Sequence, residues 1–178
     1  VEDIGAGLAR DAIIASLDGE LVDLSREITE DASFKVYTWD DNEAKEVYRH
    51  TTAHILAQAV KRLFPETQIT IGPPTDDGFY YDFDAEPFDD DDLAAIEDEM
   101  QAIIDEDYEI EREELSYDEA RHRLQGNEYK LDILDNIEDA GDTVSFYSQG
   151  EFEDLCRGPH LSSTGEVEAF TLLRSSGA

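Results

Sequence analysis

The sequence predicts an α+β fold in which an antiparallel sheet packs against long helices. Two amphipathic stretches, 41–64 and 87–107, are long enough for helices of several turns. Short apolar stretches bounded by turn residues lie before, between and after them, as is typical of strands. The apolar fraction of 40%, with 8 Phe, 8 Tyr and 1 Trp, supplies a core for one domain, or for one domain with a small neighbour.

The charge of the chain is extreme. Lys and Arg number 13 and Asp and Glu 46, which gives a net charge of −33. A disordered acidic chain would lack the aromatic residues present here, so the charge favours a folded protein adapted to molar salt. In 1 M salt the Debye length is about 3 Å, and surface carboxylates repel little beyond their neighbours. We therefore expect a halophilic source, and the charge alone does not exclude an RNA substrate.

The cysteine count and the hydropathy predict the compartment. A single cysteine excludes an internal disulfide and fits a reducing cytoplasm. No apolar run approaches the roughly 20 residues that span a bilayer, and no signal-peptide pattern is present. We expect a cytoplasmic protein without membrane contact.

Residues 1–40 are predicted to be a short α+β piece. A helix-like opening over 1–16 is followed by a hairpin turn at Asp18-Gly19 and a strand over 34–39. The piece has no obvious first strand of its own. We therefore interpret it as the tail of a domain that is cut at its start.

The first long helix is predicted after Asp41 or Asn42, either of which can cap it, and it is expected to end before Pro65. One apolar stripe recurs at helical spacing along it, formed by Ala53, Leu56, Ala57, Val60, Leu63 and Phe64.

The second half of the chain alternates strands and helices. Two strands joined by a Pro/Asp/Gly turn are expected over 68–83. The helix over 87–107 turns Leu93, Ile96, Met100, Ile103 and Ile104 inward. Its acidic run lacks the glycine and the spacing of a calcium loop, so we interpret it as a solvated face. The remaining expected elements are a strand over 108–115, short helices over 116–124 and 127–137, and strands within 142–148, 151–160 and 166–173.

His50 and His54 lie at positions i and i+4 of the first long helix, so they project from one face at the flank of the apolar stripe. The stretch is not H-E-x-x-H and therefore lacks the general base of a metalloprotease. Alone, the pair would be read as two ordinary half-buried residues.

The only cysteine, Cys156, precedes His160 by four residues in a turn that contains Gly158-Pro159. Three of the four histidines and the sole thiol fall in these two pairs, which predicts a shared site formed through the fold. Three chemistries are open: a tetrahedral zinc site, imidazoles that position water at an ester, and a cysteine nucleophile activated by histidine.

Four motifs together resemble the editing domain of threonyl-tRNA synthetases: HTTAH (50–54), IGPPTDDGFYYDF (71–83), NEYK (127–130) and DLCRGPH (154–160). This is the H-x-x-x-H … C-x-x-x-H domain shared with alanyl-tRNA synthetases and their free-standing editing relatives. By this resemblance, 41–170 form the editing domain, 1–40 the C-terminal part of a small β-grasp-like TGS domain, and 171–178 the start of a linker to an aminoacylation domain.

The resemblance implies hydrolysis of the ester of mischarged seryl-tRNA(Thr), with threonyl-tRNA(Thr) spared, by an activated water held between His50 and Lys130. It implies a catalytic set of His50, His54, Lys130, Asp154, Cys156 and His160. The implied substrate-binding set is Gly72, Pro73, Phe79, Tyr80, Tyr81, Tyr147 and Arg157, in which the aromatic strand would contact the terminal adenosine.

The resemblance also bears on cofactors and partners. It implies no metal for editing; were zinc to bind, His50, His54, Cys156 and His160 would hold it, and ATP and zinc would otherwise belong to the aminoacylation domain. The implied partners are the acceptor end of tRNA(Thr) and the remaining domains of a homodimeric synthetase. A local basic strip of Lys45, Arg49, Lys61 and Arg62 would help to hold RNA. The alternatives are a non-catalytic RNA-binding or interdomain module and a free-standing trans-editing protein of the alanyl type with zinc.

Overall fold

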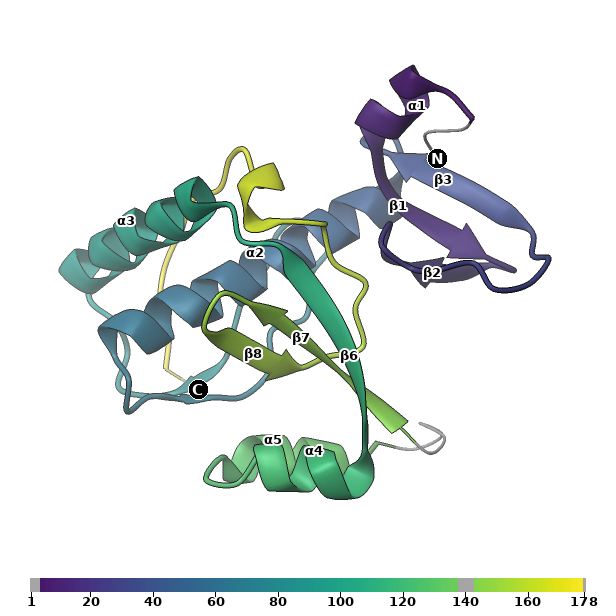
Figure 1. Cartoon of the computed structure of the whole chain (residues 1–178). Helices are drawn as coiled ribbons and strands as arrows, with labels where there is room; N and C mark the ends of the chain where they lie inside the picture. Colours follow the sequence, from purple (N-terminus) through teal and green to yellow (C-terminus); the bar gives the residue numbers. More distant parts are fainter. Residues whose placement is uncertain (1–3, 138–142, 178) are drawn as a thin grey trace.

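The computed structural model describes residues 4–137 and 143–177 and has the predicted α+β architecture. The longest helix, α2 (Asn42–Leu63), runs through the middle of the molecule (Figure 1). Helix α3 (Asp90–Glu106) packs beside it, a three-stranded sheet lies at its N-terminal end, and a second three-stranded sheet crosses it. In the described part of the chain, no helix has both the length and the apolar character needed to cross a membrane.

The N-terminal sheet consists of β1 (Ala12–Leu17), β2 (Glu20–Val22) and β3 (Phe34–Thr38) in the antiparallel order β2-β1-β3. The predicted hairpin is confirmed: Leu17 pairs with Glu20, and Asp18 and Gly19 have φ angles of 51° and 90°. These positive angles match the turn that favours Asp-Gly.

The prediction of a helix over 1–16 is wrong for the residues after Asp11. The expectation that this piece has no first strand of its own is also wrong. Helix α1 covers only Ala6–Asp11, and β1 follows it as the central strand of the sheet. The β-branched pair Ile13-Ile14 favours a strand, and β1 is paired on both edges, which no helix-period pattern reveals. Residues 1–3 of the predicted helix lie outside the described residues.

Helix α2 is buried more completely than one apolar stripe predicts. Every residue from 51 to 60 is buried, whereas Leu63 of the predicted stripe is 38% exposed. Packing on several sides explains the difference, since α2 contacts α3, β1 and β3 and hydrogen-bonds β7 (Thr143–Gln149). Gln58 Nε2 donates to the Gln149 carbonyl over 3.3 Å and Gln149 Nε2 to Gln58 Oε1 over 2.8 Å, so the polar side of the helix is satisfied in the interior.

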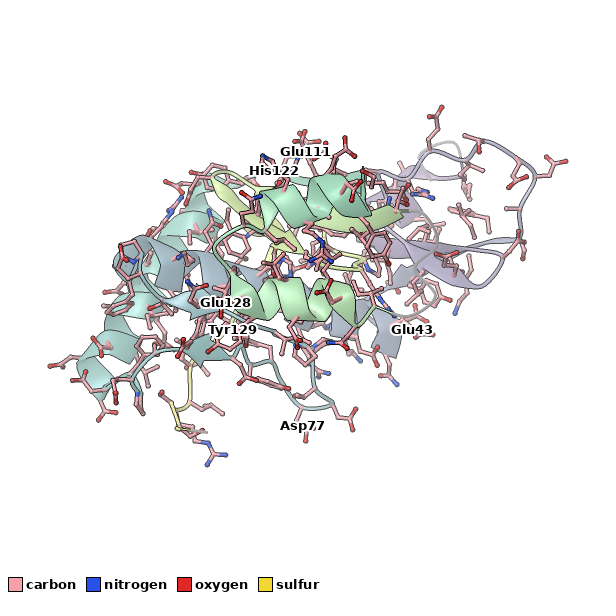
Figure 2. All side chains as sticks on the ribbon, turned by 90° about the horizontal axis from the view of Figure 1, so that it is seen from below. Glu43, Asp77, Glu111, His122, Glu128 and Tyr129 are labelled. Atoms are coloured by element: carbon pink, nitrogen blue, oxygen red, sulfur yellow. The ribbon has the colours of Figure 1, made fainter. Side chains whose placement is uncertain are left out.

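Helix α3 agrees closely with the prediction. Asp89 caps it and forms a reciprocal capping box with Asp92. Its buried residues are Ile96, Met100, Ile103 and Ile104, and only the predicted Leu93 stays half-buried. Acidic side chains lie on the outside of many elements, as Asp77, Glu111 and Glu128 show in Figure 2.

The strands predicted over 68–83 are short. They consist of β4 (Gln68–Ile69) and β5 (Phe83–Asp84), with one further bridge between Pro74 and Phe79. Prolines lack the N–H that a continuous ladder requires, which limits pairing across the turn.

The second sheet has the antiparallel order β6-β7-β8, with β6 at Ile110–Ser116 and β8 at Phe152–Leu155. Helices α4 (Tyr117–Arg123) and α5 (Glu128–Asp135) lie between β6 and β7 in the chain. Strand β8 ends directly before Cys156. This position aims the cysteine turn at the middle of α2.

The strand predicted over 166–173 is absent. A short 3-10 helix, η1, covers Thr164–Glu166, and residues 167–177 contain no strand. Side chains of α2 and α3 form hydrogen bonds with the backbone of this segment instead. The Tyr48 hydroxyl donates to the Ala169 carbonyl over 2.9 Å, and the Glu97 carboxylate accepts the Leu172 N–H.

Candidate active site

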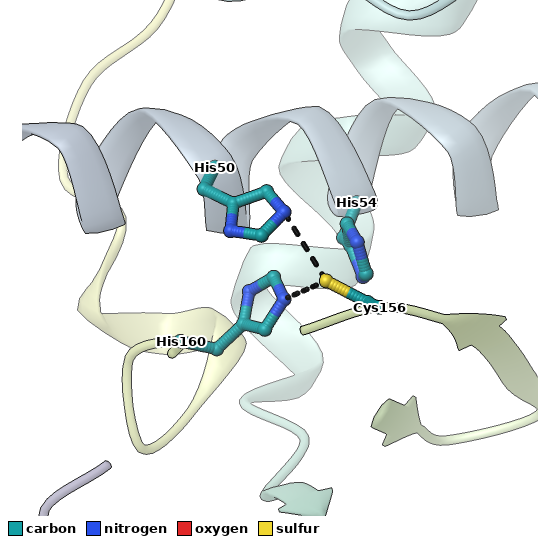
Figure 3. A group of neighbouring side chains, drawn as sticks. All are labelled: His50, His54, Cys156 and His160. Carbon is teal, nitrogen blue, oxygen red and sulfur yellow. Dashed lines mark hydrogen bonds between the residues drawn. The ribbon is translucent and has the colours of Figure 1, made fainter. Parts of the chain in front are cut away.

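Two stretches that are far apart in sequence meet at one point. His50 and His54 project from α2 toward the turn that follows β8, which carries Cys156 and His160 (Figure 3). The Cys156 sulfur lies 3.3 Å from His50 Nε2 and 3.4 Å from His160 Nε2. One ligand atom from each of the four residues lies within 4.8 Å of the other three. We call these four residues the histidine–cysteine cluster.

The backbone of the cysteine turn requires glycine at position 158. Gly158 has a φ of +67°, and a Cβ there would lie 2.0 Å from the Tyr147 hydroxyl oxygen. Its N–H donates to the Cys156 sulfur over 3.3 Å. Glycine therefore permits a left-handed conformation and a close approach that no other residue fits.

Thr51, which lies between the two histidines of α2, holds the other end of the turn. Its fully buried hydroxyl oxygen accepts the Leu161 N–H over 3.1 Å and lies 3.1 Å from His160 Nδ1. A buried hydroxyl proton requires an acceptor, and His160 Nδ1 is the one in reach, so Thr51 donates to it. His160 then carries its proton on Nε2 and donates to the Cys156 sulfur.

In His50 the proton is on the other ring nitrogen, so that Nε2 is an acceptor. A hydrogen bond to the Pro159 backbone, which offers only a carbonyl, uses one ring N–H, while Nε2 faces the Cys156 sulfur. The Nε2 lone pair of a neutral His50 therefore points into the cluster.

Burial keeps all three imidazoles of the cluster neutral. It lowers the pKa of His50 from 6.5 to about 4, and it lowers the pKa of His54 and His160 well below 6.5. Burial also raises the pKa of the Cys156 thiol to about 12. The cluster thus holds neutral bases and a protonated thiol at neutral pH.

A buried charged pair lies beside the cluster. Lys130 Nζ is 2.6 Å from Asp154 Oδ1, and both side chains are almost completely excluded from solvent. The Tyr81 hydroxyl donates to Asp154 Oδ2 over 2.6 Å and accepts from Lys130 Nζ over 3.1 Å. Burial raises the pKa of Asp154, and the Lys130 charge and the Tyr81 hydrogen bond oppose this shift.

These groups form one wall of a cleft of about 980 Å³, which is also lined by Ile71, Arg112 and Glu20. The sequence-predicted site residues that line it are His50, His54, Gly72, Pro73, Lys130, Asp154, Cys156 and Arg157. His160 and Tyr147 lie behind this wall, where their rings pack together with centroids 4.6 Å apart.

The aromatic residues Phe79, Tyr80 and Tyr81 are not among the residues that line this cleft. Tyr81 is buried, and its ring packs so closely on Gly72 that a Cβ at Gly72 would lie 2.2 Å from it. The Tyr81 hydroxyl hydrogen-bonds to the Lys130–Asp154 pair rather than facing a nucleotide base. Phe79 packs against the main core, and Tyr80 is 43% exposed outside the cleft lining. Gly72 and Pro73 are thus the predicted substrate-binding residues of this segment that line the cleft.

Sequence reasoning missed Thr51 and Asp23. Thr51 stands within HTTAH, so its position between two candidate histidines was an available signal. Asp23 accepts the His160 N–H and the Tyr147 hydroxyl, 137 and 124 residues away in the chain, and no local pattern marks it.

The predicted basic strip is not continuous. Arg62 is engaged by Glu99, Glu106 and Glu151, with N–O distances of 2.9, 2.9 and 2.6 Å. Lys61 Nζ donates to the carbonyls of Pro65 and Thr67. Lys45 and Arg49 remain at the N-terminal half of α2, nearer the cluster, where Arg49 donates to the Thr75 carbonyl over 3.2 Å.

The donor set of the cluster also matches zinc. Three imidazole nitrogens and one thiolate are ligands that zinc prefers, and they lie close enough together to share one ion. Binding would require loss of the thiol proton, which the raised pKa of Cys156 opposes and the ion itself would favour.

Comparison with known proteins points to one family. The family model described as "Threonyl and Alanyl tRNA synthetase second additional domain" matches residues 144–178. The chain is 52% identical over 174 residues to a threonine–tRNA ligase of Carboxydothermus hydrogenoformans, with 96% of this chain and 27% of the relative covered. Threonine–tRNA ligases of Haloquadratum walsbyi and Haloarcula marismortui are 49% and 48% identical over 176 residues, with 99% of this chain and 27% of each relative covered. The chain thus spans about a quarter of the length of these relatives.

Proposed function

We propose that this chain, which belongs to the threonyl-tRNA synthetase family, is the proofreading part of such an enzyme and hydrolyses the ester of seryl-tRNA(Thr). The observation that carries the proposal is the meeting of the histidine–cysteine cluster with the Lys130–Asp154 pair on one wall of a cleft. A neutral base, a fixed cation and an opening to solvent are the parts that ester hydrolysis by water requires.

An enzyme that selects its amino acid by size alone needs a second, hydrolytic site to reject a smaller amino acid. Serine differs from threonine by one methyl group, and a missing methylene supplies only about 1–3 kcal/mol of discrimination. A hydrolytic cleft that accepts serine and excludes the additional methyl group removes the error after it is made. Gly72, Pro73 and Arg157 line this cleft and are proposed to contact the aminoacylated end.

In the proposed step, a water held between His50 and Lys130 attacks the ester carbonyl carbon. His50 Nε2, which burial keeps in its base form, exchanges its contact with the Cys156 thiol for one with this water and accepts the proton. Lys130, paired with Asp154, stabilises the negative charge that develops on the carbonyl oxygen. The bond from the carbonyl carbon to the ribose oxygen breaks, and the ribose oxygen takes up the proton.

His54, Cys156 and His160 are proposed to shape the pocket and hold His50 in place. The thiol alternative is disfavoured by its raised pKa, since only a thiolate is a strong nucleophile. The proposed partners are the acceptor end of tRNA(Thr) and the rest of the synthetase. Residues 1–40 are proposed to be part of a TGS domain, 41–170 the editing domain and 171–178 a linker.

The test is a deacylation assay in molar KCl, in which the chain is incubated with seryl-tRNA(Thr) or threonyl-tRNA(Thr). We expect loss of the seryl ester only, abolished in His50→Ala. His122→Ala is the matched control, because His122 is exposed on α4 and contacts Gln125 rather than the cluster (Figure 2). Equal persistence of both esters would instead favour a non-catalytic RNA-binding module.

A further inference from the structure

Besides Glu20, which lines the cleft, the N-terminal sheet brings a second carboxylate, that of Asp23, to the candidate site. Asp23 directly follows the last residue of β2 and is half-buried, and its own carbonyl accepts the Arg26 N–H over 3.0 Å in a turn. The two carboxylate oxygens have different partners. Oδ1 accepts the backbone N–H of His160 and Oδ2 accepts the Tyr147 hydroxyl, each over 2.8 Å.

Both partners confine the His160 ring. The backbone N–H sets the place where His160 leaves the turn, and the Tyr147 ring packs on the imidazole with centroids 4.6 Å apart. On its other edge, His160 Nε2 lies 3.4 Å from the Cys156 sulfur, which in turn lies 3.3 Å from His50 Nε2. Asp23 is thus connected to His50 through three consecutive contacts, by way of His160 and Cys156.

The Tyr147 hydroxyl also presses against the cysteine turn. The space that a Cβ at Gly158 would need is taken by this oxygen, at 2.0 Å. A hydroxyl released by Asp23 would be free to move away from the turn. The hydrogen bond from Tyr147 to Asp23 therefore holds the turn as well as the ring.

The charge of Asp23 is felt at the site. Its negative charge opposes the lowering of the His50 pKa and helps to raise the pKa of Tyr147. Arg112, which lines a surface pocket together with Asp23 and also lines the cleft, faces it with the opposite charge. The N-terminal sheet therefore meets the cleft through a carboxylate and an arginine rather than through apolar packing alone.

We propose that Asp23 is a positioning residue of the hydrolytic site, through which the N-terminal sheet holds the Cys156–His160 turn against α2. The proposal deepens the proposed function and rests on it for its rate measurement. Its spectroscopic measurement is independent of activity. A purely structural role for Asp23 would change stability while leaving the imidazoles and the turnover rate as they are.

The experiment compares Asp23→Ala, Asp23→Asn and Tyr147→Phe in the full chain in molar KCl. Asp31→Ala is the control, because Asp31 is an exposed aspartate between β2 and β3. For each variant, thermal unfolding reports folding, the ¹⁵N signals of the imidazoles report the cluster, and seryl-tRNA(Thr) deacylation gives kcat and KM.

We expect Asp23→Ala to shift the ¹⁵N signals of His50 and His160 and to lower kcat between about 10- and 100-fold, with KM changed less than about threefold. Tyr147→Phe, which removes only the Oδ2 partner, and Asp23→Asn, which keeps one acceptor for the His160 N–H, are expected to give smaller changes in the same direction. The control is expected to match the unsubstituted chain in all three measurements.

Unchanged imidazole signals in a folded Asp23→Ala variant overturn the proposal, as does a loss of stability with kcat unchanged. If Asp23→Ala does not fold, Asp23→Asn and Tyr147→Phe decide by the same criteria. If the unsubstituted chain hydrolyses no ester, the proposed function fails, while the imidazole signals still show whether Asp23 positions the cluster.

Discussion

The ammonium group of Lys130 lies 2.6 Å from Oδ1 of Asp154, and the two side chains are only 4% and 3% exposed to solvent. A buried carboxylate deprived of its cation bears its full desolvation cost. We expect Lys130→Met to lower the free energy of unfolding by about 3–5 kcal/mol, as measured by urea unfolding in molar KCl. The double variant Lys130→Met/Asp154→Leu is expected to regain most of this loss, and Lys35→Met, at an exposed lysine of β3, to change it little. A Lys130→Met variant as stable as the parent would contradict the pairing.

The rate of ester hydrolysis is expected to be flat from about pH 5 to pH 8. Burial lowers the pKa of His50 from 6.5 to about 4, so its base form persists until the pH falls toward 4. The measurement is kcat for seryl-tRNA(Thr) across this range in molar KCl. An inflection near pH 6.5 would show that His50 titrates as an exposed imidazole, against the expectation.

Stability is expected to decline as the pH falls below 6.5. The pKa values of His50, His54 and His160 are lowered in the folded state, so below 6.5 the unfolded chain binds more protons than the folded one. The contribution of the buried neutral imidazoles to stability is complete above pH 6.5. It is lost as the pH falls toward the pKa values of these imidazoles in the folded state. Urea unfolding at several pH values should give a slope that is about one proton smaller in His54→Gln. His122→Gln, at an exposed histidine, should leave the slope unchanged.

No covalent seryl–enzyme is expected during turnover. The pKa of the Cys156 thiol is raised to about 12, so the thiolate is scarce at neutral pH. Cys156→Ala should nevertheless slow hydrolysis roughly 10- to 100-fold, because it removes the contact that orients His50. Acid quenching followed by intact-mass spectrometry would detect an acylated chain, and its accumulation would favour the nucleophile instead.

Hydrolysis is expected to proceed without a bound metal. Dialysis against EDTA should leave the deacylation rate unchanged, and elemental analysis should find less than one zinc per chain. The control is the same measurement on Cys156→Ala, which removes one of the four donors. Stoichiometric zinc in the parent chain, lost in this variant together with activity, would show that the cluster is a metal centre.

The fold was predictable where local signals agree. In α3, the Asp89 cap and the spacing of Ile96, Met100 and Ile103 all specify one helix with one buried face. In β1, the apolar run Ala12–Leu17 follows a helical start without a break, and only its pairing with β2 and β3 makes it a strand. The segment after η1 has strand-like composition, but side chains of α2 and α3 take its backbone hydrogen bonds.

The candidate site was predictable in its composition and less so in its arrangement. The spacing of His50 with His54 and of Cys156 with His160 indicated two pairs, and their meeting was inferred from the rarity of these residue types. Lys130 and Asp154 entered only through the family resemblance, since nothing near either residue marks a buried ion pair. Asp23 had no signal at all, because both of its partners lie more than a hundred residues away.

The burial of α2 on every side from residue 51 to 60 has a consequence for engineering the cleft. Helix α2 presents His54 and also packs against α3, β1 and β3. A substitution at a buried position of α2 is therefore expected to alter both the candidate site and the stability of the fold. Ile71, Pro73 and Arg157 also line the cleft but do not belong to α2, so exchanges there are expected to change the cleft while leaving the buried part of this helix intact.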